Sequence, residues 1–151
     1  MPPFNAASWR ALVAQVDPDA SFAPPASEAA IRDAERLLEV GFPSELRELL
    51  AEFDGFSAGY GESPVWTVAE IERGNVEFRS SPDFHELYMP FHHLLFFGED
   101  GGGDQFAFAI QADGQIHRPD VFRWDHETDA REWYAAGLRQ YLDRRLSGDD
   151  V

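Results

Sequence analysis

The sequence has 151 residues, a formal net charge of −16 and no cysteine, and all 12 of its basic residues are arginine. The lack of cysteine excludes disulfides, thiolate metal sites and a cysteine nucleophile, and the lack of lysine excludes a Walker-A phosphate loop and a Schiff-base lysine. The acidity argues against nucleic-acid binding and favours a basic protein partner, with a solubility surface, salt adaptation or arginine-biased codons as the alternative.

A chain of this length usually forms one domain, and its 44% hydrophobic residues are enough for one core. The first residues lack a basic start followed by an apolar run, and no stretch approaches the roughly 18 apolar residues of a membrane span. We therefore expect residues 1–151 to form a single cytoplasmic domain that does not bind a membrane.

The N-terminal part of the chain predicts short helices, because its apolar residues are spaced three and four apart. The first covers SWRALVAQV and ends at Asp17-Pro18. The second begins after a capping Ser27 and ends at Gly41, which we expect in the left-handed conformation with Phe42 packed on Leu37. The inward-facing residues of these two helices are Trp9, Leu12, Val13, Val16, Ile31, Ala34, Leu37 and Leu38.

A third helix is predicted from Pro43 to Asp54-Gly55, with Leu46, Leu49, Leu50 and Phe53 on one face. After a loop, Val65-Trp66 can form a short strand. Thr67 and Glu70 then predict the capping box of a fourth helix over about residues 68–78. Residues 79–93 contain two prolines and no period, so they are predicted to be irregular.

From Leu94 onward the apolar period changes to two, which predicts strands in LLFFGED, QFAFAIQ and VFRWD. Asp113-Gly114 predicts a tight hairpin between QFAFAIQ and QIHR, and hence antiparallel pairing. The segment DAREWYAAGLRQYLDRRL is predicted to be the longest helix, because Tyr134, Leu138, Tyr141 and Leu142 share one helical face. N-terminal helices, a central mostly antiparallel sheet and a C-terminal covering helix indicate an α+β fold.

The sequence contains no recognisable catalytic or metal-binding motif. His92-His93 and the run Asp125-His126-Glu127 lack ligand spacing, and neither Gly-x-Ser-x-Gly nor His-Glu-x-x-His occurs. The loop GEDGGGD, residues 98–104, is too acidic for a phosphate cradle and lacks the spacing of a calcium loop, so we interpret it as a wide turn. A paired-carboxylate glycosidase is unsupported rather than excluded. We expect no catalytic residue, no metal and no cofactor.

Three segments together resemble the SUKH superfamily, also known as the Smi/Knr-like domain. The first is FPSELRELLAEFDGF, a helix entered by a proline and ended by Asp-Gly, where the family often has Asn-Gly. The others are LLFFGEDGGGDQFAFAI, a strand, a Gly-Asp turn and a second strand, and VFRWDHETDAREWYAAGLRQYL, the closing strand and helix. The resemblance covers roughly residues 27–146. Each motif is short, but their order and spacing together are specific.

The resemblance implies that the protein works by binding rather than by catalysis. Bacterial SUKH domains typically bind and neutralise a co-encoded toxin, often a nuclease, whereas fungal relatives regulate cell-wall assembly. An immunity protein that occludes a toxin stoichiometrically is therefore the leading hypothesis, and a regulatory or scaffold domain in envelope assembly is the alternative. A third class, an unrecognised hydrolase, would place His92 and His93 in a cleft with carboxylates.

Because the family fixes no shared binding residue, the predicted partner site rests on charge and exposure. The acidic residues proposed for a basic partner are Glu99, Asp100, Asp104, Asp125 and Glu127. Candidate apolar anchors are Phe56, Tyr60 and Trp66, since tyrosine and tryptophan concentrate binding energy in interfaces. A solvated acidic loop and ordinary core aromatics are the alternatives for these two sets. The sequence does not indicate the oligomeric state.

Overall fold

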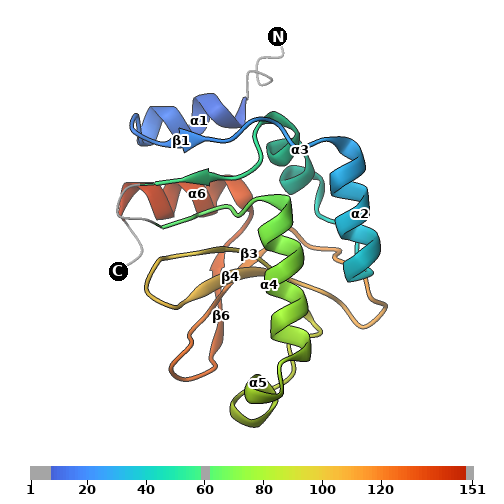
Figure 1. The fold of residues 1–151 in the computed structure, drawn as a ribbon. Coiled ribbons are helices and arrows are strands. Elements are labelled where there is room, and N and C mark those ends of the chain that lie inside the picture. Colours follow the sequence, from blue (N-terminus) through green and yellow to red (C-terminus); the bar gives the residue numbers. More distant parts are fainter. Residues whose placement is uncertain (1–7, 59–61, 149–151) are drawn as a thin grey trace.

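The computed structural model describes residues 8–58 and 62–148. Six helices and six strands follow one another in these residues (Figure 1). They are α1 (Trp9–Val16), β1 (Ser21–Phe22), α2 (Glu28–Leu38), α3 (Ser44–Glu52), β2 (Phe56–Ser57), α4 (Val68–Ser80), α5 (Pro82–Leu87), β3 (Leu94–Glu99), β4 (Gln105–Ala109), β5 (Val121–Trp124), β6 (Arg131–Ala135) and α6 (Leu138–Ser147). Within the described ranges, no helix combines the length and the apolar character needed to cross a membrane.

The first helices form where the sequence predicts them, but the end of α2 differs. Ser27 caps α2 by accepting a hydrogen bond from the Ala30 N–H. The helix then ends at Glu39, whose φ of 59° is left-handed, and not at Gly41. Within α2 the buried face is formed by Ile31, Ala34 and Leu38, whereas Leu37 points outward and is 58% exposed. The prediction that Leu37 faces inward and packs against Phe42 is therefore wrong.

The predictions for α3 and α4 are confirmed, whereas the segment between α4 and the sheet is not irregular. The predicted apolar face of α3 is buried, and Thr67 and Glu70 form the full capping box of α4. Residues Pro82–Leu87 form α5, opened by a proline at its start, where the missing N–H is harmless. Val65 makes a single bridge to Phe56 of β2 rather than a strand with Trp66.

The central sheet has the order β3-β4-β5-β6 and is antiparallel throughout. Asp113-Gly114 does form a turn, with Gly114 at φ 83°, but QIHR is not a strand and β4 pairs with β5 instead. The largest error concerns residues 131–135, which form the strand β6 and not the first turns of the last helix. Helix α6 consequently has 10 residues and is shorter than α4, which has 13.

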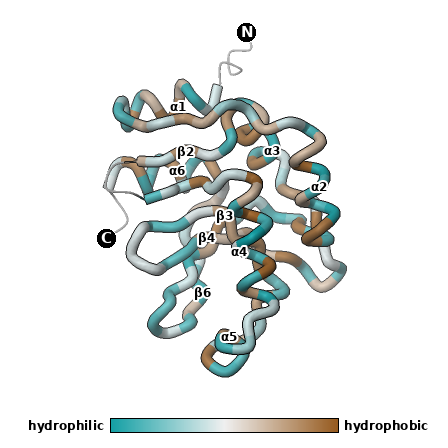
Figure 2. The backbone as a smooth tube through the Cα atoms, in the orientation of Figure 1, coloured by the Kyte–Doolittle hydropathy of each residue, from teal (hydrophilic) through white to brown (hydrophobic). Residues whose placement is uncertain are grey.

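The sheet lies between two helices that pack on opposite faces. Phe78 of α4 packs on Phe96, with ring centroids 4.5 Å apart, and Tyr141 of α6 packs on Phe97 from the other side at 5.0 Å. Adjacent strand residues point to opposite faces, which is why Phe96 and Phe97 contact different helices. Hydrophobic residues gather where α4 meets the strands (Figure 2). The fold is therefore a single α+β domain with a C-terminal helix on the sheet.

The outer edge of β3 is covered by hydrogen bonds. The N–H of Trp66 donates to the Phe97 carbonyl (2.8 Å), and the N–H of Glu99 donates to the Ser63 carbonyl (3.0 Å). At the preceding residue of β3, the buried amide of Asn75 accepts from the Phe96 N–H and donates to the Phe96 carbonyl, both at 2.9 Å. This edge has no free backbone group at Phe96 to offer another strand.

Candidate partner-binding site

Two loops that carry predicted acidic residues meet at one end of the sheet. The β3–β4 loop spans residues 100–104 and the β5–β6 loop spans residues 125–130, and both lie at the same end because the strands are antiparallel neighbours (Figure 1). Arg123 of β5 holds both ends of the β3–β4 loop: its Nε donates to Asp104 Oδ2 (3.0 Å) and its Nη2 to Asp100 Oδ2 (3.1 Å). The fold also brings together Asp104 and Asp125 from the two loops, since one carboxylate oxygen of each lies within 4.8 Å of the other.

We call Glu99, Asp100, Asp104, Asp125 and Glu127 the acidic end. Their carboxylates outnumber the neighbouring basic groups, so this end of the sheet keeps a negative charge. Its members are not equally available, since the side chains of Asp100 and Asp104 are only 17% and 15% exposed and are held by Arg123. Glu127 is exposed. The acidic end therefore has two carboxylates that Arg123 holds in place, Asp100 and Asp104, and an accessible carboxylate at its rim, Glu127.

His126 fixes the two loops to each other. Its Nδ1 lies 2.7 Å from Asp104 Oδ1, and its backbone N–H donates to the same oxygen at 3.2 Å. The imidazole also lies against Gly103, where an added Cβ would come within 2.6 Å of the ring. The hydrogen bond to Asp104 raises the pKa of His126 above its usual range. Burial raises the pKa of Asp104, but hydrogen bonds from His126 and Arg123 outweigh it and hold the pKa below its ordinary value.

These shifts predict a pH-dependent stability. Because the folded pKa of His126 is raised, its protonated form stabilises the fold fully below about pH 6.5, and this contribution is lost as the pH rises through the folded pKa. The lowered pKa of Asp104 affects stability only at acidic pH. The stability that its ionised form contributes is lost as the pH falls through its folded pKa. We expect the free energy of unfolding of wild type minus that of His126→Gln to shrink from about pH 5 to about pH 9. Urea unfolding measures it, and a constant difference would contradict the assignment.

Asp104, Asp125 and His126 also form a cluster of metal-ligating residues that the sequence spacing did not indicate. One ligand atom from each lies within 4.8 Å of the others. Asp104 Oδ1 and His126 Nδ1 are already hydrogen-bonded to each other, and Asp125 Oδ1 accepts from the Glu127 N–H at 2.8 Å. Asp104 and His126 thus hold the two loops together, Asp125 bonds within its own loop, and the prediction of a protein without a metal stays a prediction.

The predicted apolar anchors do not lie on an exposed surface. Phe56 and Trp66 are 4% and 6% exposed and belong to the core. The indole Nε1 of Trp66 donates to Glu99 Oε2 at 3.1 Å, so this tryptophan orients a member of the acidic end. Tyr60 lies outside the described residues. Trp66 therefore offers little surface to a partner.

An exposed aromatic residue that the sequence did not point to is Trp133 of β6. Its side chain is 53% exposed, and Met89 before β3 is 58% exposed. Arg131 lies between them, because its Nη2 donates to the Met89 carbonyl (2.8 Å) and it precedes Trp133 by two strand positions on the same face. The sequence offered no clear signal, because the burial of β6 does not alternate residue by residue and the apolar residues of the same segment fit a helical period.

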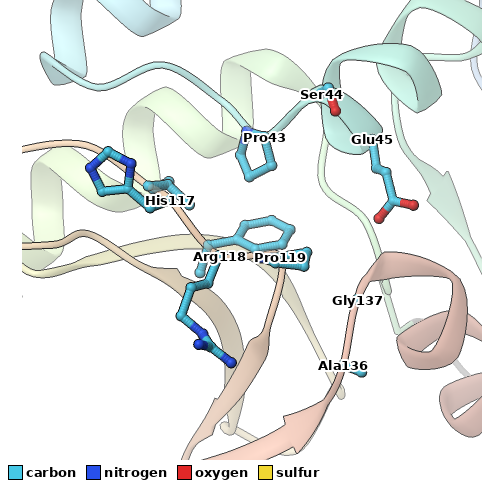
Figure 3. Close-up of a pocket in the computed structure, with 10 residues that line it drawn as sticks. Pro43, Ser44, Glu45, His117, Arg118, Pro119, Ala136 and Gly137 are labelled. Carbon is cyan, nitrogen blue, oxygen red and sulfur yellow. The ribbon is translucent and has the colours of Figure 1, made fainter.

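A cavity of about 450 Å³ opens at the opposite end of the sheet. Figure 3 shows Glu45 reaching from the start of α3 towards Gly137, with His117 and Arg118 on another wall. Glu45 Oε1 accepts from the Leu138 N–H at 3.4 Å, which caps α6, whose N-cap residue Gly137 has no side chain to do so.

The cavity lining does not include His92 or His93, so this cavity is not the cleft of these two histidines with carboxylates that the hydrolase hypothesis predicts. His93 instead accepts a hydrogen bond from Arg131 (3.0 Å). Burial, followed by the charge of Arg131, lowers the pKa of His93. His117 pairs with Asp113 at 2.6 Å. The histidines therefore contact separate parts of the surface.

Comparison with known families finds a match over most of the chain. A family model described as SUKH_6, SMI1-KNR4 cell-wall, matches residues 28–142. The matched range runs from the start of α2 into α6 and includes all four strands of the central sheet. The comparison with curated proteins gave no match.

Proposed function

The chain belongs to the SUKH family, and from this premise we propose that it is an immunity protein that binds a basic toxin and blocks it stoichiometrically, without catalysis. The family is known for immunity-type and cell-wall-related domains that are generally non-catalytic. In this proposal the protein acts in the cytoplasm, needs no cofactor and has a toxin domain, such as a nuclease, as its partner. Nucleic acid and membrane are not partners.

The observation that carries the proposal is the acidic end of the sheet. Arg123 and His126 fix its two loops, so a partner does not have to order them on binding. The net negative charge attracts a basic partner over a distance of about 8–10 Å at physiological salt and speeds association. Preorganised loops with an accessible carboxylate rim suit a stoichiometric inhibitor.

Regulation of cell-wall or envelope assembly is the second candidate, because the matching family model carries the cell-wall description. This alternative shares the binding role and differs in the partner. It predicts binding to a protein of wall synthesis and no protection against a toxin.

Co-purification with the product of the neighbouring reading frame tests the immunity proposal. We expect a complex of fixed stoichiometry whose affinity falls as the salt concentration rises, and loss of the partner's toxicity in cells that contain both proteins. If that product is neither bound nor neutralised, the immunity proposal is wrong.

A charge reversal at the rim of the acidic end tests which surface steers the partner. Asp100 and Asp104 are unsuitable, because reversing them removes their ion pairs with Arg123. Glu127→Lys is preferable, because the side chain is exposed. We expect it to slow association a few-fold at low salt with little effect on dissociation. The matched control is Glu48→Lys on α3, an equal charge change at another exposed glutamate.

Stopped-flow association kinetics at two salt concentrations measures this effect. Equal slowing by Glu127→Lys and Glu48→Lys would show that total charge steers the partner rather than the acidic end. In that case the residues assigned to the site are wrong, although the immunity role could stand.

A further inference from the structure

The two edges of the central sheet differ. The edge at β3 is covered by Ser63, Trp66 and Asn75, as described above. The other edge is β6, which is the last strand of the sheet. Arg144 of α6 donates to the Tyr134 carbonyl and covers the second half of β6, whereas Glu132 and Trp133 are exposed. Within the described residues, the first half of β6 is therefore an open edge.

The backbone groups that face outward follow from the register. The Asp125 N–H donates to the Ala130 carbonyl at 2.9 Å, so these two residues form a hydrogen-bonded antiparallel pair. Such pairs alternate, which makes Arg123 and Glu132 the next hydrogen-bonded pair. Arg131 and Trp133 of β6 then direct their N–H and C=O groups away from β5. These groups can pair with an added strand.

An apolar anchor lies beside this edge. The exposed indole of Trp133 is oriented by its Nε1, which donates to Asp120 Oδ2 at 2.8 Å. Met89, whose backbone carbonyl accepts a hydrogen bond from Arg131, is also exposed. Tryptophan, methionine and arginine are the residue types enriched in the cores of protein interfaces. A side chain of the partner can therefore pack here while its backbone pairs with β6.

The charges beside the open edge of β6 determine which kind of strand can bind there. Glu132 lies on β6, and Asp125 and Glu127 of the acidic end lie in the loop between β5 and β6. A charged residue on an edge strand guards against unwanted pairing, and here it repels a second copy of a chain whose net charge is −16. The same charges attract a basic strand.

We propose that the open edge of β6, from Arg131 to Trp133, binds an extended basic segment of the partner protein, which adds a fifth strand to the sheet. This inference rests on the proposed function, because it names the surface through which the partner is held. Strand addition takes its affinity from backbone hydrogen bonds and its specificity from alternate side chains. In the bound segment, basic side chains face Glu132 while apolar ones face Trp133.

Peptides of defined conformation test the proposal. The probe is an alternating Arg-Val octapeptide, and the controls are an alternating Glu-Val octapeptide and a helix-forming Arg-Ala peptide with the same charge as the probe. We expect only the Arg-Val peptide to slow amide hydrogen exchange at Arg131 and Trp133. Equal protection by the Arg-Ala peptide, or protection confined to other elements, would overturn strand addition.

Two substitutions of Trp133 distinguish the contribution of its indole to peptide binding from that of its backbone N–H. Trp133→Ser removes the anchor but keeps the N–H, and we expect it to weaken Arg-Val peptide binding roughly tenfold or more. Trp133→Pro also removes the outward N–H, which an edge strand tolerates, and we expect it to abolish measurable binding. Thermal unfolding checks that both variants fold. Wild-type affinity in both variants would overturn the proposal.

The complex with the neighbouring gene product distinguishes this inference from the proposed function. If that product binds the wild type and both Trp133 variants equally, the β6 edge is not the docking surface although the immunity role stands. If it does not bind at all while the Arg-Val peptide protects β6, the immunity role fails and the strand-binding edge stands. A concentration-dependent dimer with protected β6, seen by sedimentation, would assign the edge to self-pairing and overturn the proposal.

Discussion

Replacing Gly98 with alanine is expected to lower the free energy of unfolding by about 3–5 kcal/mol. A Cβ at this position would lie 2.0 Å from the Pro64 carbonyl oxygen and 3.0 Å from the Tyr141 hydroxyl. That hydroxyl donates to the same carbonyl at 2.7 Å in a buried site. The methyl group must therefore break this hydrogen bond or push residues 63–66 away from β3.

Urea denaturation measures the effect, and Gly102→Ala provides the control. Gly102 lies in the adjacent loop, where an added Cβ would come no closer than 3.6 Å to Asp100 Oδ1. We expect the control to change stability by less than about 0.5 kcal/mol, as is usual at the surface. If Gly98→Ala is as mild as Gly102→Ala, the contact between residues 63–66 and β3 does not constrain the fold.

Asn75→Leu is expected to destabilise the fold by a similar amount, about 3–5 kcal/mol. Asn75 is 1% exposed, and its side chain bonds Phe96 N–H, Phe96 C=O and the Ile71 carbonyl. Leucine has a similar size but leaves both Phe96 groups buried without partners, and each such group costs about 1–3 kcal/mol. Urea denaturation measures the loss, and an effect below about 1 kcal/mol would show that water replaces the amide.

Asn75→Asp tests the hydrogen bonds of the Asn75 side chain without changing its shape. The variant keeps an acceptor for the Phe96 N–H but directs its second oxygen at the Phe96 carbonyl, so the ionised form is unfavourable in this buried site. The pKa of the introduced carboxyl is raised in the folded state, and the destabilisation relative to wild type should grow as the pH rises above the unfolded pKa. Unfolding at acidic and neutral pH checks this, and a deficit independent of pH would contradict it.

Most elements of the fold could be predicted because they depend on neighbouring residues. Ser27 and Thr67 cap helices through bonds to residues three positions away. Strands β3, β4 and β5 follow from an apolar period of two. The predicted end of α2 at Gly41 was wrong, because Glu39 takes the left-handed conformation that glycine more often adopts. Phe42 instead bonds through its N–H to Glu35 Oε2 at 2.7 Å.

The candidate site could be predicted only in part. The acidic residues were found from composition, and the fold joins their two loops through Arg123 and His126, neither of which the sequence linked to them. Trp66 was assigned to the surface and is in the core, whereas Trp133 was assigned to a helix and is on an open strand. Exposure of a tryptophan depends on which elements cover it, and a local pattern does not contain that information.

The sequence by itself determined the acidity, the class of fold, the helix caps and the three aromatic strands, because each depends on composition or on residues a few positions apart. Only the tertiary structure decided that residues 131–135 form a strand, since their spacing fits a helix equally well. The decision comes from distant partners: Tyr134 packs its ring on Phe106 and Tyr141, and β6 pairs with β5. The hydrogen bonds and the buried aromatic surface gained in this arrangement outweigh the helical preference of the segment, and they leave Trp133 on the outside.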